Sequence, residues 1–107
     1  MATPADQITK LEENLRANPE KVAGMNGVFQ FDLSGEGGGV WHVSLANGDG
    51  HVGEGPAENP GVTISMAADD FVALTEGRLD GTMAFMSGKL KVKGDMGLAM
   101  KLQTLLR

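Results

Sequence analysis

The C-terminal segment constrains the fold most, because residues 95–106 predict a helix that is apolar on nearly every side. Its leucines form one stripe, and Met96, Ala99 and Met100 extend the apolar surface around the helix. A helix at the surface of a globular domain normally shows a single apolar stripe. We therefore expect this helix to be buried on two sides, with a sheet on one side and a ligand, a flexible segment or a partner subunit on the other.

The sequence predicts five strands, four of them from alternating apolar residues and the third in chain order from the hairpin dipeptides that precede it. They cover about residues 28–33, 40–45, 51–54, 62–66 and 89–93. Gly-rich connections join the first three, and residues 47–50 contain two dipeptides that favour tight hairpin turns. We expect these three strands to form an antiparallel meander, from which a Pro/Gly loop over residues 55–61 leads to the fourth strand.

Helices are predicted before, between and after these strands. Thr3 can cap a helix that has Pro4 at its first position and ends at Asn18. Two aspartates suit the start of a second helix over residues 69–76, and residues 83–86 form about one further turn. The elements predict an α+β fold, in which a five-stranded, mainly antiparallel sheet is covered on one face by helices.

Length and composition indicate one globular domain over residues 1–107. Hydrophobic residues make up 41% of the chain and charged residues 21%, an ordinary balance for a soluble protein. No apolar run approaches the roughly 18 residues of a membrane-spanning helix, and the N-terminus lacks the pattern of a secretory signal. The chain has no cysteine for a disulfide or a thiolate metal site. A cytoplasmic location is the expectation.

The charges are spread unevenly along the chain. A net charge of -5 disfavours a nucleic-acid partner, since phosphate binding depends on clustered Lys and Arg. The strand over residues 89–93 nevertheless places Lys89, Lys91 and Lys93 on one face. Such a row either keeps a solvated edge strand from pairing with another molecule, or makes a transient contact with anionic headgroups at a membrane surface.

Signals of catalysis are weak. His42 and His51 lie on neighbouring predicted strands without the His, Asp or Glu spacing of a metal site. The Gly-rich stretch 35–39 joins two strands, whereas a phosphate loop joins a strand to a helix. We therefore predict no catalytic residue, no metal and no cofactor. The alternative from another class is a small enzyme that uses both histidines and a carboxylate.

Methionine is concentrated in the second half of the chain. Five of the seven methionines occur from the fourth strand onward together with two phenylalanines, the set being Met66, Met83, Met86, Met96, Met100, Phe71 and Phe85. Unbranched, polarizable Met side chains adapt to irregular shapes. The set fits a pocket for acyl chains or rings of varied outline, and it also fits plain core packing.

The stretch from Ala84 to Asp95, preceded by Asp70-Phe71 and Gly77 and followed by the helix over residues 99–105, resembles a sterol carrier protein type 2 domain. The resemblance implies an apolar tunnel between sheet and helices that takes fatty acids, acyl-CoAs, sterols or other lipids, without catalytic residues of its own. The C-terminus lacks a peroxisomal tripeptide and leaves little chain to close the tunnel mouth. A fatty acyl or isoprenoid lipid is therefore favoured over a sterol.

Carried onto this chain, the resemblance predicts the side chains of the tunnel wall. The helices and the turn would contribute Phe71, Leu74, Met83, Phe85, Met86, Leu98, Leu102 and Leu105. The sheet would contribute Phe29, Phe31, Trp41 and Met66.

Energetics limits how such a tunnel can behave when it is empty. A rigid void of roughly 300 Å³ would cost about 7 kcal/mol, comparable to the whole stability of a small domain. An empty form must therefore collapse, hydrate or dimerise, and a bound lipid should raise the Tm. The alternative function is an accessory or dimerisation module, whose apolar groove docks a partner protein or a second copy of the chain.

Overall fold

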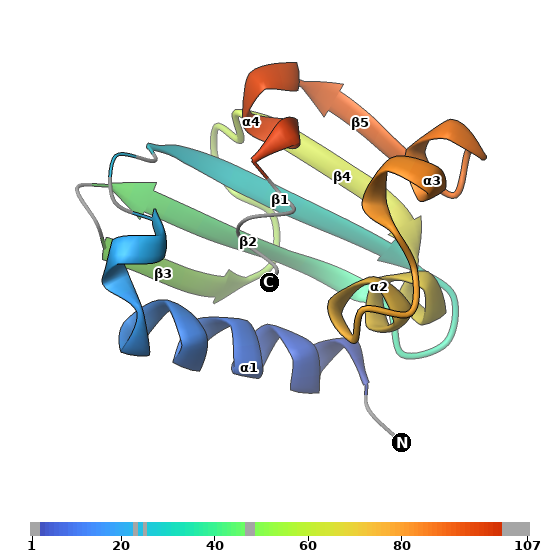
Figure 1. Cartoon of the computed structure of the whole chain (residues 1–107), viewed down its shortest axis with the longest axis horizontal. Coiled ribbons are helices and arrows are strands. Elements are labelled where there is room, and N and C mark those ends of the chain that lie inside the picture. The colour runs from blue at the N-terminus through green and yellow to red at the C-terminus, as the bar shows by residue number, and fades with distance from the viewer. Residues whose placement is uncertain (1–2, 23, 25, 47–48, 102–107) are drawn as a thin grey trace.

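The computed structural model describes residues 3–22, 24, 26–46 and 49–101 (Figure 1). Helices and strands follow one another in the order α1 (Pro4–Ala17), the 3₁₀ helix η1 (Pro19–Val22), β1 (Gly27–Ser34), β2 (Gly39–Ala46), β3 (Asp49–Glu54), β4 (Val62–Ala67), α2 (Ala68–Thr75), α3 (Gly81–Met86), β5 (Leu90–Gly94) and α4 (Met96–Met100). This order confirms the α+β fold class predicted from the sequence.

The five strands form one mixed, open sheet in the order β3-β2-β1-β4-β5. β1, β2 and β3 are the predicted antiparallel meander, with Phe29 opposite Val43 and Val43 opposite Val52. β4 pairs with β1 in parallel and with β5 in antiparallel orientation. The crossover between β3 and β4 returns the chain across the sheet, and this return places β5 at an edge.

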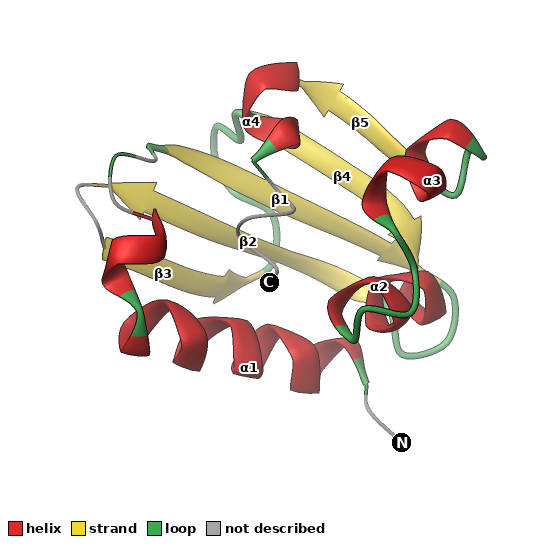
Figure 2. Ribbon diagram, in the orientation of Figure 1, coloured by secondary structure: helices red, strands yellow, loops and turns green. Residues whose placement is uncertain are grey.

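The helices cover one face of the sheet (Figure 2). Alternation along β1 and β4 turns Phe29, Phe31 and Ile64 toward that face, where each is fully buried. α1 adds a buried stripe of Ile8, Leu11 and Leu15. The hydrophobic core therefore lies between the sheet and this helical layer.

α2 packs against α1 and against β1 and β4 of the sheet. Phe71 of this helix is fully buried, and its ring lies 5.5 Å from the Phe31 ring, tilted by 56°. Gln7 of α1 donates from Nε2 to Thr75 Oγ1 of α2 over 2.7 Å, although Gln7 itself is buried. An aromatic contact and a buried hydrogen bond thus join α2 to the sheet and to α1.

Local capping sets the helix boundaries. The Thr3 hydroxyl accepts from Asp6 N, and the Asp6 carboxylate accepts from Thr3 N, which is the reciprocal capping box of a helix start. α3 begins at Gly81, two residues before the predicted start, because the Asp80 carboxylate accepts from the amides of Thr82 and Met83. The part of the predicted last helix from residue 102 onward lies outside the described residues.

Polar side chains occupy the sheet face opposite the helices. His42 lies on this face, where Nδ1 donates to the Gly55 carbonyl over 2.9 Å. Gln30 accepts from Ala57 N through Oε1 and donates to the Asp32 carboxylate through Nε2. These bonds hold the crossover loop against the sheet. Within the described part of the chain, no helix combines the length and the apolar character needed to cross a membrane.

Candidate functional site: an apolar cavity between two short helices and the edge strand

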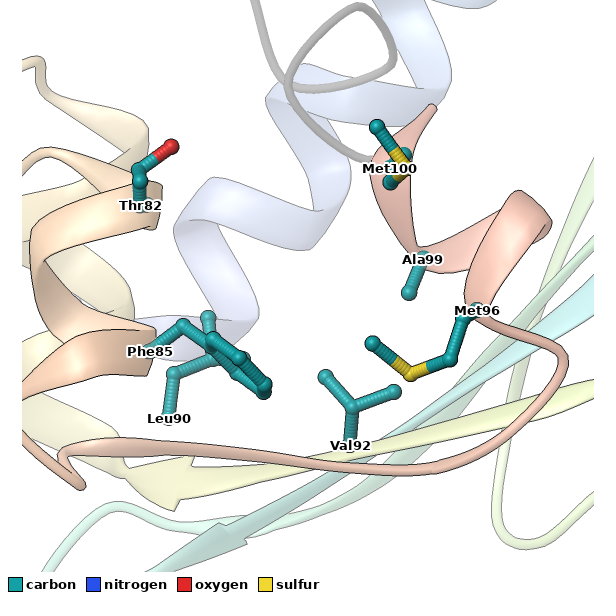
Figure 3. A pocket seen from close by; sticks show the side chains of 8 residues that line it. Thr82, Phe85, Leu90, Val92, Met96, Ala99 and Met100 are labelled. Atoms are coloured by element: carbon teal, nitrogen blue, oxygen red, sulfur yellow. The ribbon is translucent and has the colours of Figure 1, made fainter.

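A cavity of about 300 Å³ lies where α3, β5 and α4 meet (Figure 3). The described residues that line it are Gly81, Thr82, Phe85, Leu90, Val92, Met96, Ala99 and Met100. Three large apolar side chains of the lining are exposed, Phe85 at 47%, Met96 at 49% and Met100 at 80%, and the polar Thr82 is exposed as well. The cavity therefore has an apolar mouth as well as an apolar floor.

β5 supplies the floor. Leu90 and Val92 pair with Met66 and Ile64 of β4, so they continue the apolar face of the sheet beneath the cavity. The alternation of β5 turns Lys91 and Lys93 to the opposite face. β5 therefore presents its aliphatic side chains to the cavity and its lysines to the other face, at the edge of the sheet.

α3 supplies one wall. Its Phe85 points toward Leu90 and Val92 across the cavity (Figure 3). Gly88 then takes a φ of 82°, which suits glycine, and Lys89 N donates to the Ala84 carbonyl over 2.9 Å. This tight turn brings β5 back directly beneath the helix that precedes it.

α4 supplies the opposite wall. The Asp95 carboxylate caps this helix by accepting from Gly97 N and Leu98 N, and Asp95 N donates to the Gly61 carbonyl over 2.8 Å. Met96 extends over Val92 toward Phe85, and Ala99 faces the same space (Figure 3). Capping and the contact to Gly61 therefore fix the start of the wall.

Leu98 holds α4 against the sheet by filling a notch between two glycines. A Cβ at Gly27 would lie 2.8 Å from Leu98 Cδ2, and one at Gly61 would lie 2.7 Å from Leu98 Cδ1. Both distances are too short for a real side-chain contact. The missing Cβ atoms at these two positions allow α4 to approach the sheet closely.

We expect Gly61→Ala to displace the end of the Leu98 side chain, loosen α4 and lower the free energy of unfolding by about 1 kcal/mol, the lower end of the usual cost of overpacking. Urea unfolding measures the loss. Gly61→Ala combined with Leu98→Ala is the matched test, because the shorter side chain leaves room for the new methyl group. The pair should then be less destabilised than the sum of the two single variants; additive losses would contradict the notch.

The cavity lining is almost free of polar groups. Among the described residues that form it, none carries a charge, and Thr82 is the one with a polar side chain. Such a surface offers dispersion and burial to an apolar ligand, and it would penalise a buried charge. The arrangement suits a flexible hydrocarbon chain whose polar end stays at the mouth.

The predicted tunnel residues separate into five groups. Phe29, Phe31, Met66 and Phe71 are buried in the core, and Trp41, Leu74 and Leu98 pack against that core while partly exposed. Phe85 lines the cavity, whereas Met83 and Met86 are exposed on α3 and are not part of its lining. Leu102 and Leu105 lie outside the described residues. The cavity thus lies nearer the sheet edge than the prediction placed the tunnel.

Several lining residues were not among the predicted wall residues. They are Gly81, Thr82, Leu90, Val92, Met96, Ala99 and Met100. Alternation of Leu90 and Val92 with lysines was a signal for the floor, and the second apolar side of the last helix was a signal for Met96, Ala99 and Met100. Gly81 and Thr82 carried no such signal, because they were expected to precede α3.

The histidines lie away from this cavity. The His42 ring packs over Gly53 on the helix-free face, where a Cβ at Gly53 would come 2.5 Å from His42 Cε1. His51 is exposed on β3, opposite Ser44 of β2. In the described ranges, no group of three or more His, Asp or Glu side chains is placed to hold a metal ion. The hydrogen bond to Gly55 gives His42 a structural role.

Comparison with known proteins agrees with the fold and with the resemblance. A family model described as the SCP-2 sterol transfer family matches residues 7–107. Hydroxysteroid dehydrogenase-like protein 2 of Xenopus tropicalis is 47% identical over 106 residues, which is 98% of this chain and 25% of that protein. The chain therefore spans about a quarter of the length of this curated relative.

Two solved structures show the same fold. The sterol carrier protein domain 2 of Helicoverpa armigera is 34% identical with a TM-score of 0.77, the match covering 98% of this chain and 87% of that one. Palmitated SCP2L2 from Aedes aegypti is 27% identical with a TM-score of 0.70, the match covering 91% of each chain. On the family match and these likenesses, the chain belongs to the SCP-2 sterol transfer family.

Proposed function

We propose that this chain binds the hydrocarbon tail of a fatty acyl lipid in the cavity between α3, β5 and α4, and carries the lipid without transforming it. The observation that carries the proposal is the cavity itself, about 300 Å³ in volume and lined by uncharged, mainly apolar side chains. This volume lies at the lower end of the range for small-molecule sites. The domain boundaries, residues 1–107, and a cytoplasmic location are part of the same proposal.

A flexible acyl chain fits these walls better than a rigid ring system. Two methionines and one phenylalanine form the movable part of the lining, and an unbranched thioether side chain can follow a flexible ligand as it bends. The palmitated relative from Aedes aegypti supports the same class of ligand. The names of the relatives also point to sterols and hydroxysteroids, which makes these the competing ligands to test.

The proposal is tested by titrating delipidated protein with a fluorescent long-chain acyl probe below its micelle concentration. We expect saturable binding of about one probe per chain and displacement of the probe by palmitate. A sterol and a hydroxysteroid serve as separate competitors, and displacement by these alone would contradict the acyl assignment. Absence of binding to folded protein would favour a module that docks another protein.

Affinity should depend on acyl chain length in a way that surface adsorption does not. Each buried methylene contributes about 0.8 kcal/mol, so each added methylene should lower the Kd about fourfold until the cavity is full. Competition by saturated fatty acids of increasing length measures this slope and its end point. Binding that is independent of length would exclude burial of the tail in the cavity.

A further inference from the structure

Two exposed methionines belong to the wall of the cavity. Met96 is 49% exposed and Met100 is 80% exposed, and both line the cavity from α4. Met96 extends over Val92 toward Phe85, which places its sulfur inside the space between the two walls (Figure 3). These thioethers are therefore accessible to a small oxidant when no ligand is bound.

Other methionines of the chain serve as controls for the accessibility of Met96 and Met100. Met83 and Met86 of α3 are 64% and 77% exposed but are not part of the cavity lining. Met66 of β4 is 5% exposed within the core. Exposed methionines inside the cavity can thus be compared with exposed methionines outside it and with a buried one.

We propose that Met96 and Met100 are an oxidation site that closes the cavity to acyl ligands when the two thioethers become sulfoxides; the inference rests on the proposed function. A hydroperoxide is the oxidant. One peroxide oxygen forms a bond to sulfur while the O–O bond breaks, sulfur loses two electrons, and the other oxygen leaves as water or an alcohol after receiving the proton. Sulfoxide reductases reverse the change at the expense of thiols.

Oxidation opposes binding for a physical reason. A sulfoxide oxygen is a strong hydrogen-bond acceptor, and an acyl chain in this cavity would remove it from water. The described lining offers no charged donor and one hydroxyl, that of Thr82, to replace the lost water. The oxidised cavity should therefore bind an acyl chain at least about tenfold more weakly.

The test begins with delipidated protein treated with hydrogen peroxide and followed by peptide mapping. Met83, Met86, Met96 and Met100, the exposed methionines among the described residues, should be oxidised faster than Met66. Saturating palmitate should protect Met96 and Met100 while leaving the rates at Met83 and Met86 unchanged. Equal rates at Met66 and at the cavity methionines, or protection of all exposed methionines alike, would overturn the inference.

The functional arm compares acyl-probe affinity before and after oxidation in two matched double variants. Met96→Leu with Met100→Leu removes both sulfur atoms from the cavity and should keep its affinity after peroxide treatment. Met83→Leu with Met86→Leu removes two exposed sulfur atoms outside the cavity and should lose affinity as the wild type does. Thermal unfolding of each oxidised sample confirms that the lost binding is not lost folding.

The possible results distinguish a failure of the oxidation site from a failure of the proposed lipid binding. Wild-type affinity that survives complete oxidation of Met96 and Met100 would overturn the switch and leave lipid binding intact. Equal loss in both double variants would also overturn it, because the effect would then arise elsewhere in the chain. If the unoxidised wild type does not bind the probe, the proposed function itself fails and this inference fails with it.

Discussion

Replacing Phe71 by alanine is expected to lower the free energy of unfolding by about 3–5 kcal/mol. Phe71 is fully buried and its ring packs 5.5 Å from that of Phe31, so truncation leaves a void in the centre of the core. A loss of this size approaches the whole stability of a small domain. Urea unfolding of the delipidated protein measures it, with Phe71→Leu as a milder variant if the alanine variant does not fold.

Phe85→Ala is the control for this change. The Phe85 side chain is 47% exposed at the cavity mouth, so its loss should cost much less folding free energy while weakening the binding of an acyl probe. The two alanine variants distinguish a core residue from a cavity residue, although both Phe71 and Phe85 were predicted to line a tunnel. Equal stability losses would show that Phe71 is not the core residue described above.

Replacing Phe85 by glutamate is expected to weaken acyl binding at least about tenfold, because a bound acyl chain would remove part of the water around an unpaired carboxylate. The described lining has no cation to pair with it, and the carboxylate of a fatty acid would repel it if the two came close. Probe titration measures the affinity, and thermal unfolding shows whether the fold persists.

Met86→Glu is the matched control. It introduces the same charge at the next position of the same helix, on a side chain that is 77% exposed and not part of the cavity lining. Affinity should stay near that of the wild type. If both glutamate variants lose binding equally, the effect is a general consequence of negative charge on α3, and Phe85 is not the wall of the binding site.

Local patterns were sufficient to predict the elements of this fold. Alternation identifies β1, β2, β4 and β5, because a half-buried strand places successive side chains on opposite faces, and the hairpin dipeptides before β3 identify that strand. The capping box of Thr3 with Asp6 specifies the start of α1 through contacts three residues apart. The errors were of one or two residues, as at Gly81, where the capping role of Asp80 had not been recognised.

The place of the cavity was harder to predict, since it depends on contacts between distant segments. Met83, Phe85 and Met86 belong to the same short helix, but of the three Phe85 alone lines the cavity. Leu98 belongs to the apolar surface of α4, yet it fills the notch at Gly27 and Gly61. The spacing of apolar residues in a sequence does not show which of them pack against another helix or strand and which face a ligand.

The sequence by itself determined the strands, the helix starts, the charged outer face of β5 and the excess of apolar surface at the C-terminal end. Hydrogen-bonding capacity and side-chain spacing decide these features within a few residues. The tertiary structure alone decided that β4 lies parallel to β1 and that Leu90, Val92, Met96 and Met100 face one cavity. Burial and close packing between segments far apart in the chain are the physical reason for that difference.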